Sequence, residues 1–224
     1  MTSFPALPGD AFRRLDEGPD EAFYRQPRFV THIDEAAIAT VTELYRHHFP
    51  AGGAILDLMS SWVSHLPPEV PYARVVGVGM NAEELAENPF LDEWHVQNLN
   101  REPRLSFGDA TFDGAAICVS IQYLVRPVDV LREVARVLRP QAPLVITYSN
   151  RCFATKAIAC WRLLDDAGHL RLIGRYLAEA GNWGDIACCN ADRDCRRAQG
   201  GDPLYAVIAR RADPSAEETP SQES

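Results

Sequence analysis

The residues best suited to hold a ligand come at the ends of three apolar runs, 54–58, 74–78 and 115–121. Met59, Met80 and Ile121 stand there among residues that are small or carry hydroxyl, amide or carboxylate groups: Asp57, Ser60, Ser61, Gly79, Asn81, Ser120 and Gln122. Their oxygens accept hydrogen bonds from a small molecule. The six cysteines include no C-x-x-C pair and there is no matching histidine array, so we predict no metal site.

The elements that must position these residues alternate between strand and helix. Expected strands cover 54–58, 74–78, 95–97, 115–121 and 144–148, and expected helices cover 35–49, 81–87 and the segment from Pro127 to Leu138. This order predicts a doubly wound α/β sheet. Right-handed crossovers then bring the carboxyl ends of the strands to one edge, where ligands bind at the switch in strand order.

The C-terminal third is expected to complete the sheet. Residues 152–180 have a helical composition that is broken near Gly168, and Gly181 suits a helix C-cap. Two strands, 184–189 and 204–209, follow and are predicted to pair antiparallel at the sheet edge.

A longer segment resembles a known family. Its parts are Phe107-x-Asp109-x-x-Phe112-Asp113, an apolar strand, and Leu131-Arg-Glu-Val-Ala-Arg-Val-Leu-Arg-Pro140. Together, over residues 54 to about 148, they resemble class I S-adenosylmethionine-dependent methyltransferases of the small-molecule, type 11-like group. The resemblance implies a Rossmann-like, seven-stranded, mostly parallel sheet with an antiparallel C-terminal strand. It also implies S-adenosylmethionine as cofactor and a small-molecule acceptor.

The first half of the motif set departs from the family. In the family, strand 1 enters a glycine-rich loop, but here the glycine positions hold Met59, Ser61 and Val63. Gly79 stands where a carboxylate holds the ribose, and Asn98 stands where an acidic residue faces the adenine. The resemblance assigns Asp57, Met59, Ser60, Ser61, Gly79, Met80, Asn81, Asn98, Leu99 and Ser120 to Gln122 to the cofactor site.

Two interpretations of this departure stay open. The loop is a subfamily variant that still binds the cofactor, with Asn81 and Asn98 offering amide oxygens, or the site has decayed and the domain is a non-catalytic binding or regulatory subunit. We favour the variant, because decay should scatter charged residues, whereas this loop keeps Asp57 and small hydroxyls. A dinucleotide-dependent oxidoreductase is disfavoured, because strand 1 lacks Gly-x-Gly-x-x-Gly.

Candidates for chemistry on the acceptor lie around the same edge. His65, Tyr123 and Arg151 are catalytic candidates, and Tyr24, His32, Asn150 and Arg151 are candidates for substrate binding. Each has a structural alternative: His65 as a packing residue, the aromatics as anchors of the N-terminal segment, and Arg151 as a surface partner of Asp165 or Asp166.

Composition limits the partners. The formal net charge is −9, which disfavours nucleic acid, and no apolar run is long enough to span a membrane. We expect a cytoplasmic protein with reduced cysteines; the sequence indicates no oligomeric state. The expected organisation is an N-terminal lid (1–33), a methyltransferase domain (34–211) with a possible cap insertion (151–167), and a disordered acidic tail (212–224).

Overall fold

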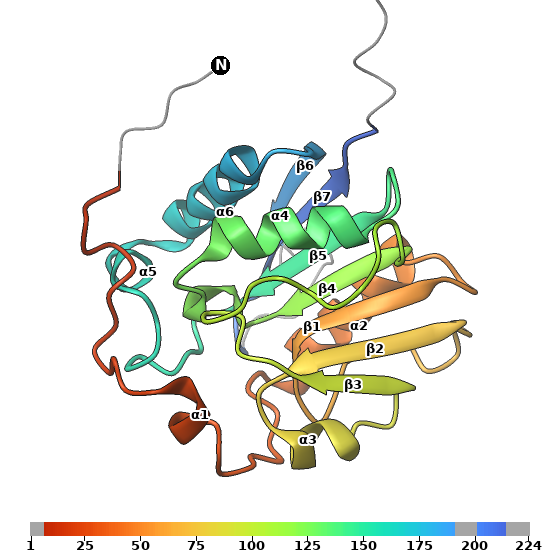
Figure 1. Ribbon diagram of the computed structural model, residues 1–224, viewed down its shortest axis with the longest axis horizontal. Coiled ribbons are helices and arrows are strands. Elements are labelled where there is room, and N and C mark those ends of the chain that lie inside the picture. The colour runs from red at the N-terminus through yellow and green to blue at the C-terminus, as the bar shows by residue number, and fades with distance from the viewer. Residues whose placement is uncertain (1–6, 191–200, 214–224) are drawn as a thin grey trace, which may run out of the picture.

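Apolar segments form the predicted seven-stranded sheet in the computed structural model, which describes residues 7–190 and 201–213 (Figure 1). The strands are β1 (Ala54–Ser60), β2 (Arg74–Gly79), β3 (Glu93–Val96), β4 (Gly114–Cys118), β5 (Pro143–Tyr148), β6 (Trp183–Asn190) and β7 (Tyr205–Arg211). Their order is β3-β2-β1-β4-β5-β7-β6. The first five are parallel, and β7 pairs antiparallel with both β5 and β6, which confirms the expected edge pair.

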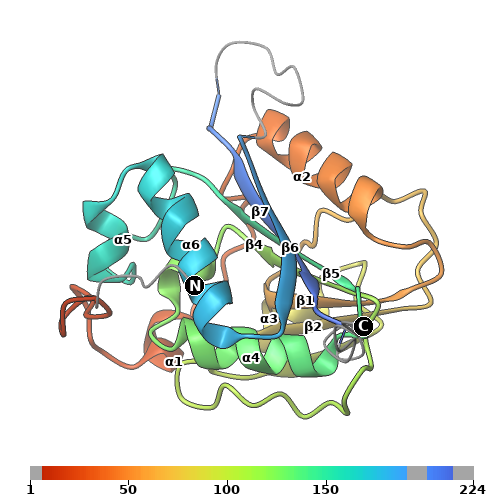
Figure 2. The same ribbon diagram turned by 90° about the horizontal axis from the view of Figure 1, so that it is seen from above.

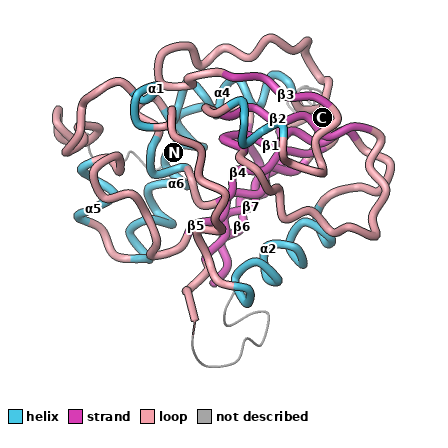
Figure 3. The backbone as a smooth tube through the Cα atoms, turned by 90° about the horizontal axis from the view of Figure 1, so that it is seen from below, coloured by secondary structure: helices cyan, strands magenta, loops and turns pink. Residues whose placement is uncertain are grey.

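Alternating side chains of each strand are buried on opposite faces of the sheet. Ile55 and Val75 pack with helix α2 (Glu35–His48). Leu56 and Val76 lie in the cluster that includes helices α4 (Pro127–Val137) and α6 (Asp166–Ala180). Figures 2 and 3 show α2 on one side of the sheet and the other two helices on the opposite side. The central strands are therefore covered on both faces, as parallel sheets require.

The helix limits follow local signals, with one correction. Asp34 caps α2 by accepting the Ala37 amide at 2.8 Å, and Gly181 ends α6 with φ of 70°. The break expected near Gly168 exists but lies slightly earlier, between α5 (Ala159–Leu163) and α6, because Asp165 caps the new helix by accepting the Gly168 amide at 2.7 Å. Residues 152–158 precede α5 and are not helical.

The strand predicted over 115–121 is too long at its carboxyl end. It stops at Cys118, Val119 adopts φ of 42°, and a short 3₁₀ turn, η1, covers Ile121–Tyr123. The backbone therefore turns before Ser120, which places that residue at the sheet edge and not within the ladder.

The strand order reverses between β1 and β4, so the ligand edge lies at their carboxyl ends. Figure 1 shows the N-terminal segment, with α1 (Asp20–Phe23), passing α5 and α3 (Ala82–Ala86) on the side where the parallel strands end. In the described part of the chain, no helix has the length and apolar character needed to cross a membrane. Residues 214–224, most of the expected acidic tail, and residues 1–6 lie outside the described ranges.

Candidate functional site

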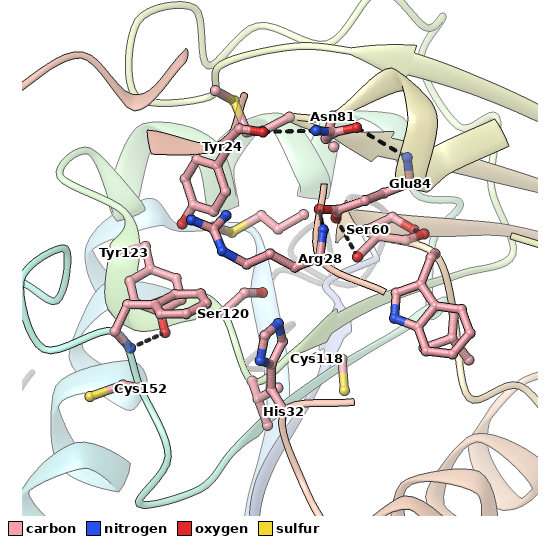
Figure 4. Close-up of a pocket in the computed structure, with 18 of the residues that line it drawn as sticks. Tyr24, Arg28, His32, Ser60, Asn81, Glu84, Cys118, Ser120, Tyr123 and Cys152 are labelled. Atoms are coloured by element: carbon pink, nitrogen blue, oxygen red, sulfur yellow. Dashed lines mark hydrogen bonds between the residues drawn. The ribbon is translucent and has the colours of Figure 1, made fainter. Parts of the chain in front are cut away.

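A cavity of about 640 Å³ opens at the carboxyl ends of β1, β2 and β4. Its walls come from residues 57, 59–63, 65, 78–81, 97–100, 118–120, 123 and 124, and it is closed over by residues of the N-terminal segment and by 151–153. The volume falls within the range of small-molecule and cofactor sites. The fold thus brings together most of the residues that the sequence analysis selected (Figure 4).

The bend after β1 is built around a buried carboxylate. Asp57 is 4% exposed, and its Oδ2 atom accepts the hydroxyls of Ser60 and Ser64, each at 2.6 Å. Asn88 donates to the Ser64 hydroxyl at 2.9 Å, which fixes that hydroxyl in turn. Met59 has φ of 58°, so the first glycine position of the family keeps a left-handed backbone without a glycine.

Burial raises the pKa of Asp57 to about 6, against its two serine hydrogen bonds, which lower it. A carboxyl group whose pKa is higher in the folded than in the unfolded state stabilises the fold below the unfolded pKa. That stabilisation is lost as the pH rises through about 6. Asp57 therefore favours the folded state at acidic pH relative to neutral pH.

We expect the substitution Asp57→Asn to remove this dependence, because an amide oxygen can accept both serine hydroxyls without charge. Relative to the variant, the wild-type protein should lose about 2.5 kcal/mol of its free energy of unfolding between pH 4 and pH 7.5. Urea unfolding of both proteins at the two pH values measures this. A constant difference between them would contradict the burial of an ionisable Asp57.

The β1 bend approaches β2 so closely that only glycine fits at position 79. A Cβ atom on Gly79 would lie 2.3 Å from the Ser60 carbonyl oxygen and 3.0 Å from Leu85 Cδ2. Ser60 also pairs in register with Gly79, past an irregularity in the β1–β2 ladder. The missing ribose carboxylate and the altered bend are therefore one structural change: the Ser60 backbone takes the space that a side chain at 79 would need.

The two asparagines expected to offer amide oxygens have other partners. Asn81 Oδ1 caps α3 by accepting the amides of Glu83 and Glu84, and its Nδ2 donates to the Tyr24 carbonyl at 2.8 Å. Asn98 Oδ1 accepts the Asn100 amide, and its Nδ2 donates to Glu21 at 2.9 Å. Both amides therefore fasten the N-terminal segment to the cavity rim.

A buried carboxylate that the sequence analysis missed lies on the β2 side of the cavity. Glu84 is 8% exposed, accepts the Ser61 hydroxyl at 2.5 Å and accepts the Arg28 amide at 2.8 Å. Its signal in the sequence was weak, because an acidic residue in the first turn of a helix is usual at any helix N-terminus. Only the fold shows that it faces the cavity.

Ser120 supplies an unpartnered polar group at the end of β4. Its side chain lines the cavity, and its buried hydroxyl has no hydrogen-bond partner among the described residues. A buried hydroxyl without a partner is costly unless a ligand or water satisfies it. Ile121 and Gln122 are wholly buried and, like the exposed Asn150, do not line the cavity.

Large side chains do not fill the cavity. Trp62 turns its indole outward, donating to the Val30 carbonyl at 3.1 Å and meeting Phe29 edge-on. Met59 packs against the core cluster on the α4 side of the sheet. Room for a ligand therefore persists beside a bend that has no glycine.

The N-terminal segment is held over the cavity by a buried ionic network. Lys156 is 1% exposed and lies 3.1 Å from Asp16 and 3.3 Å from Asp20. Asp20 also pairs with Arg14 at 2.5 Å and accepts Asn100 Nδ2 at 3.0 Å. Charged groups on two separated parts of the chain, with the amide of Asn100 from a third, thus fix one wall of the site.

The catalytic candidates differ in their surroundings. His65 lines the cavity, and burial lowers its pKa to about 4. The Tyr123 hydroxyl accepts the Phe153 amide at 2.8 Å, and burial raises its pKa to about 12. The structural alternative for Arg151 was an ion pair with Asp165 or Asp166. The structure instead pairs Arg151 with Asp202 at 2.7 Å. His32 and Tyr24 both line the cavity.

Comparisons with known proteins agree with this architecture. Residues 59–146 match the family model described as a methyltransferase domain. No curated protein matches the sequence. Among solved structures, the [4+2]-cyclase SpnF shares 13% identity, with 77% of this chain and 80% of that chain covered and a TM-score of 0.55.

Two further structures show the same fold. An S-adenosylmethionine-dependent methyltransferase from Mesorhizobium loti shares 15% identity over 77% of this chain and 98% of that one, with a TM-score of 0.51. Phosphoethanolamine N-methyltransferase 2 from Haemonchus contortus, solved with S-adenosyl-L-methionine, shares 14% identity over 78% of this chain and 52% of that one, with a TM-score of 0.56. The family match and the fold support S-adenosylmethionine as the cofactor. This chain has the class I S-adenosylmethionine-dependent methyltransferase fold and carries a methyltransferase-domain match over residues 59–146.

Proposed function

We propose that this protein binds S-adenosylmethionine in the cavity and transfers its methyl group to a small-molecule acceptor. The observation that carries the proposal is the open cavity of about 640 Å³ beside the β1 bend, with the unpartnered Ser120 hydroxyl in its wall. Met80 and Leu99 offer apolar walls to the adenine. Glu84, and not residue 79, offers a carboxylate on the ribose side.

The bound cofactor would supply a methyl group on a sulfonium, and the chain must align the acceptor with it and exclude water. The N-terminal segment closes the cavity from outside, which favours a small acceptor. Burial lowers the pKa of both His32 and His65, so both imidazoles are neutral at pH 7, and His32 is the better proton acceptor because the pKa of His65 falls to about 4.

A second candidate is a non-catalytic subunit with this fold. It is favoured by Gly79, which has no side chain, and by Asn81 and Asn98, whose side-chain oxygens already accept backbone amides. A similar solved structure is described as a [4+2]-cyclase, and a fold does not by itself fix an activity.

Calorimetric titration with S-adenosylhomocysteine tests cofactor binding, and so distinguishes the methyltransferase from the non-catalytic subunit. Micromolar binding supports a cofactor site, and no heat at millimolar ligand contradicts it. Release of S-adenosylhomocysteine from the methyl donor in the presence of small-molecule acceptors then tests transfer itself.

Ser120→Ala gives a sharper form of this test. Because the hydroxyl has no partner in the free protein, its removal should leave the free energy of unfolding unchanged or slightly higher. Binding of S-adenosylhomocysteine should weaken about five- to tenfold, since one hydrogen bond is worth about 1 kcal/mol. Ser64→Ala is the matched control: its hydroxyl is fully bonded outside the cavity, so that variant should lose stability. Unchanged ligand affinity in Ser120→Ala would remove Ser120 from the site.

A further inference from the structure

One cation in the cavity wall has no carboxylate partner in the described part of the chain. Three arginines line the cavity; Arg14 pairs with Asp20 at 2.5 Å, and Arg151 pairs with Asp202 at 2.7 Å. To the residues that the structure describes, the Arg28 side chain makes one hydrogen bond, from Nη2 to the Phe23 carbonyl at 2.9 Å. A guanidinium carries five N–H donors, so the other four make no hydrogen bond to the described residues.

Aromatic rings hold this guanidinium in place. Its central carbon lies 4.7 Å from the ring centre of Phe23, 5.3 Å from that of Phe153 and 6.0 Å from that of Tyr24. Such contacts stabilise a cation and fix the plane of the guanidinium while leaving its N–H edges open. Figure 4 shows the Arg28 side chain crossing the cavity from the Glu84 side toward Tyr24 and Tyr123.

The nearby acidic groups already have other partners. Asp57 accepts two serine hydroxyls, and Asp20 is held by Arg14 and Lys156. Glu84 binds the main-chain amide of Arg28 and the Ser61 hydroxyl, not the guanidinium. A half-buried guanidinium that has no anionic partner in the protein favours binding of an anionic ligand. A planar carboxylate fits this role because it can accept two of the guanidinium N–H donors at once.

The position of Arg28 relative to the strands indicates which ligand. Phe153 follows β5, and its ring centre lies 5.3 Å from the guanidinium carbon, so the guanidinium reaches the β5 side of the crevice, whereas Met80, Asn98 and Leu99 follow β2 and β3. Those three residues line the half next to β2 and β3, where the adenosine is proposed to bind. The other half is left for the acceptor.

We propose that Arg28 anchors a carboxylate of the acceptor, so that the substrates of this site are small carboxylic acids. The inference rests on the proposed function, because it divides one cavity between cofactor and acceptor. The aromatic rings around Arg28 also provide faces against which a planar acceptor can stack.

The test compares three acids with their neutral carboxamides: benzoate, phenylacetate and 4-hydroxybenzoate. With the wild-type protein, at least one acid should bind ten or more times tighter than its amide by calorimetry. Arg28→Gln should abolish this preference, and Arg28→Lys should keep part of it. Arg25→Gln is the matched control, because Arg25 is exposed on the same segment and does not line the cavity. No acid preference in any of the three pairs, or one that survives Arg28→Gln, would overturn the proposal.

The cofactor also has a carboxylate, which could be the group that Arg28 binds. A second pair of probes distinguishes the carboxylate of the cofactor from that of the acceptor. S-adenosylhomocysteine carries that carboxylate, and 5′-methylthioadenosine lacks it. If Arg28 serves the acceptor, Arg28→Gln should change the affinity for both nucleosides equally, by less than threefold. Selective loss of S-adenosylhomocysteine binding would assign Arg28 to the cofactor and overturn the proposal.

Failure of the proposed function would look different from failure of this inference. If the wild-type protein binds neither nucleoside, the cofactor site is absent. The acid and amide titrations need no cofactor, and they still decide whether Arg28 selects carboxylates.

Discussion

Restoring the family's carboxylate with Gly79→Asp should destabilise the protein by at least about 4 kcal/mol and should not improve cofactor binding. The new Cβ would lie 2.3 Å from the Ser60 carbonyl oxygen, which belongs to the backbone and cannot rotate away. The variant would also bury a charge with no cation provided for it. Urea unfolding and titration with S-adenosylhomocysteine measure the two effects.

Two glycine-to-alanine variants separate the cost of the steric clash at position 79 from the cost of the buried charge. Gly79→Ala should lose about 2 to 3 kcal/mol through the clash alone. Gly174→Ala is the matched control, since a Cβ there meets nothing within 4 Å and lies in helix α6. That control should be neutral or more stable by up to about 1 kcal/mol. If Gly79→Asp folds normally and binds the nucleoside more tightly, the bend does not occupy the ribose position.

Lys156→Ala should lower the free energy of unfolding by about 3 kcal/mol, because it removes a buried cation from the ionic network and leaves Asp20 with Arg14 as its one remaining cation among the described residues. Lys156 is the only lysine in the chain, and it also donates to the Gly18 carbonyl at 2.7 Å. Its loss should free the N-terminal segment, so amide hydrogen exchange across residues 16–28 should rise more than exchange in the central strands.

An exposed ion pair gives the matched control for this variant. Arg46 contacts Glu43 and Glu69, each at 2.6 Å, with 36% of its side chain exposed. Arg46→Ala should therefore cost less than about 1 kcal/mol. In the wild-type protein, Lys156 should react slowly with amine-specific reagents, and a ligand in the cavity should slow it further. Rapid modification of Lys156 in the free protein would show that the segment is not closed over the site.

Much of the fold could be predicted because its signals are local. The runs that became β1, β2 and β5 have strand length and are bounded by turn residues, and Asp34 and Gly181 mark helix ends by capping. The alternation of strand and helix, with right-handed crossovers, then left few topologies and placed Asp57 and Ser120 at one edge. The break at Gly168 was misplaced because Asp165 is the stronger helix start, and capping outweighs the low helix propensity of one glycine.

The partners of the site residues could not be predicted in the same way. An amide oxygen at Asn81 or Asn98 is an acceptor in any sequence, yet here each oxygen accepts a nearby backbone amide while the Nδ2 group of the same side chain fastens the N-terminal segment. Glu84 and Arg28 lie 56 positions apart and meet only because α3 packs beneath that segment. Hydrogen-bond partners at such separations depend on three-dimensional packing, which no local pattern encodes.

The sequence by itself determined the α/β architecture, the edge where ligands bind and the family resemblance, because periodicity, caps and short motifs act between near neighbours in the chain. Only the tertiary structure decided that the Ser60 backbone fills the space over Gly79, that Glu84 is the carboxylate on that side, and that Arg28 is the cavity's arginine without an acidic partner among the described residues. The physical reason is that a cavity is defined by atoms from distant segments, and whether a polar group is free depends on all of them.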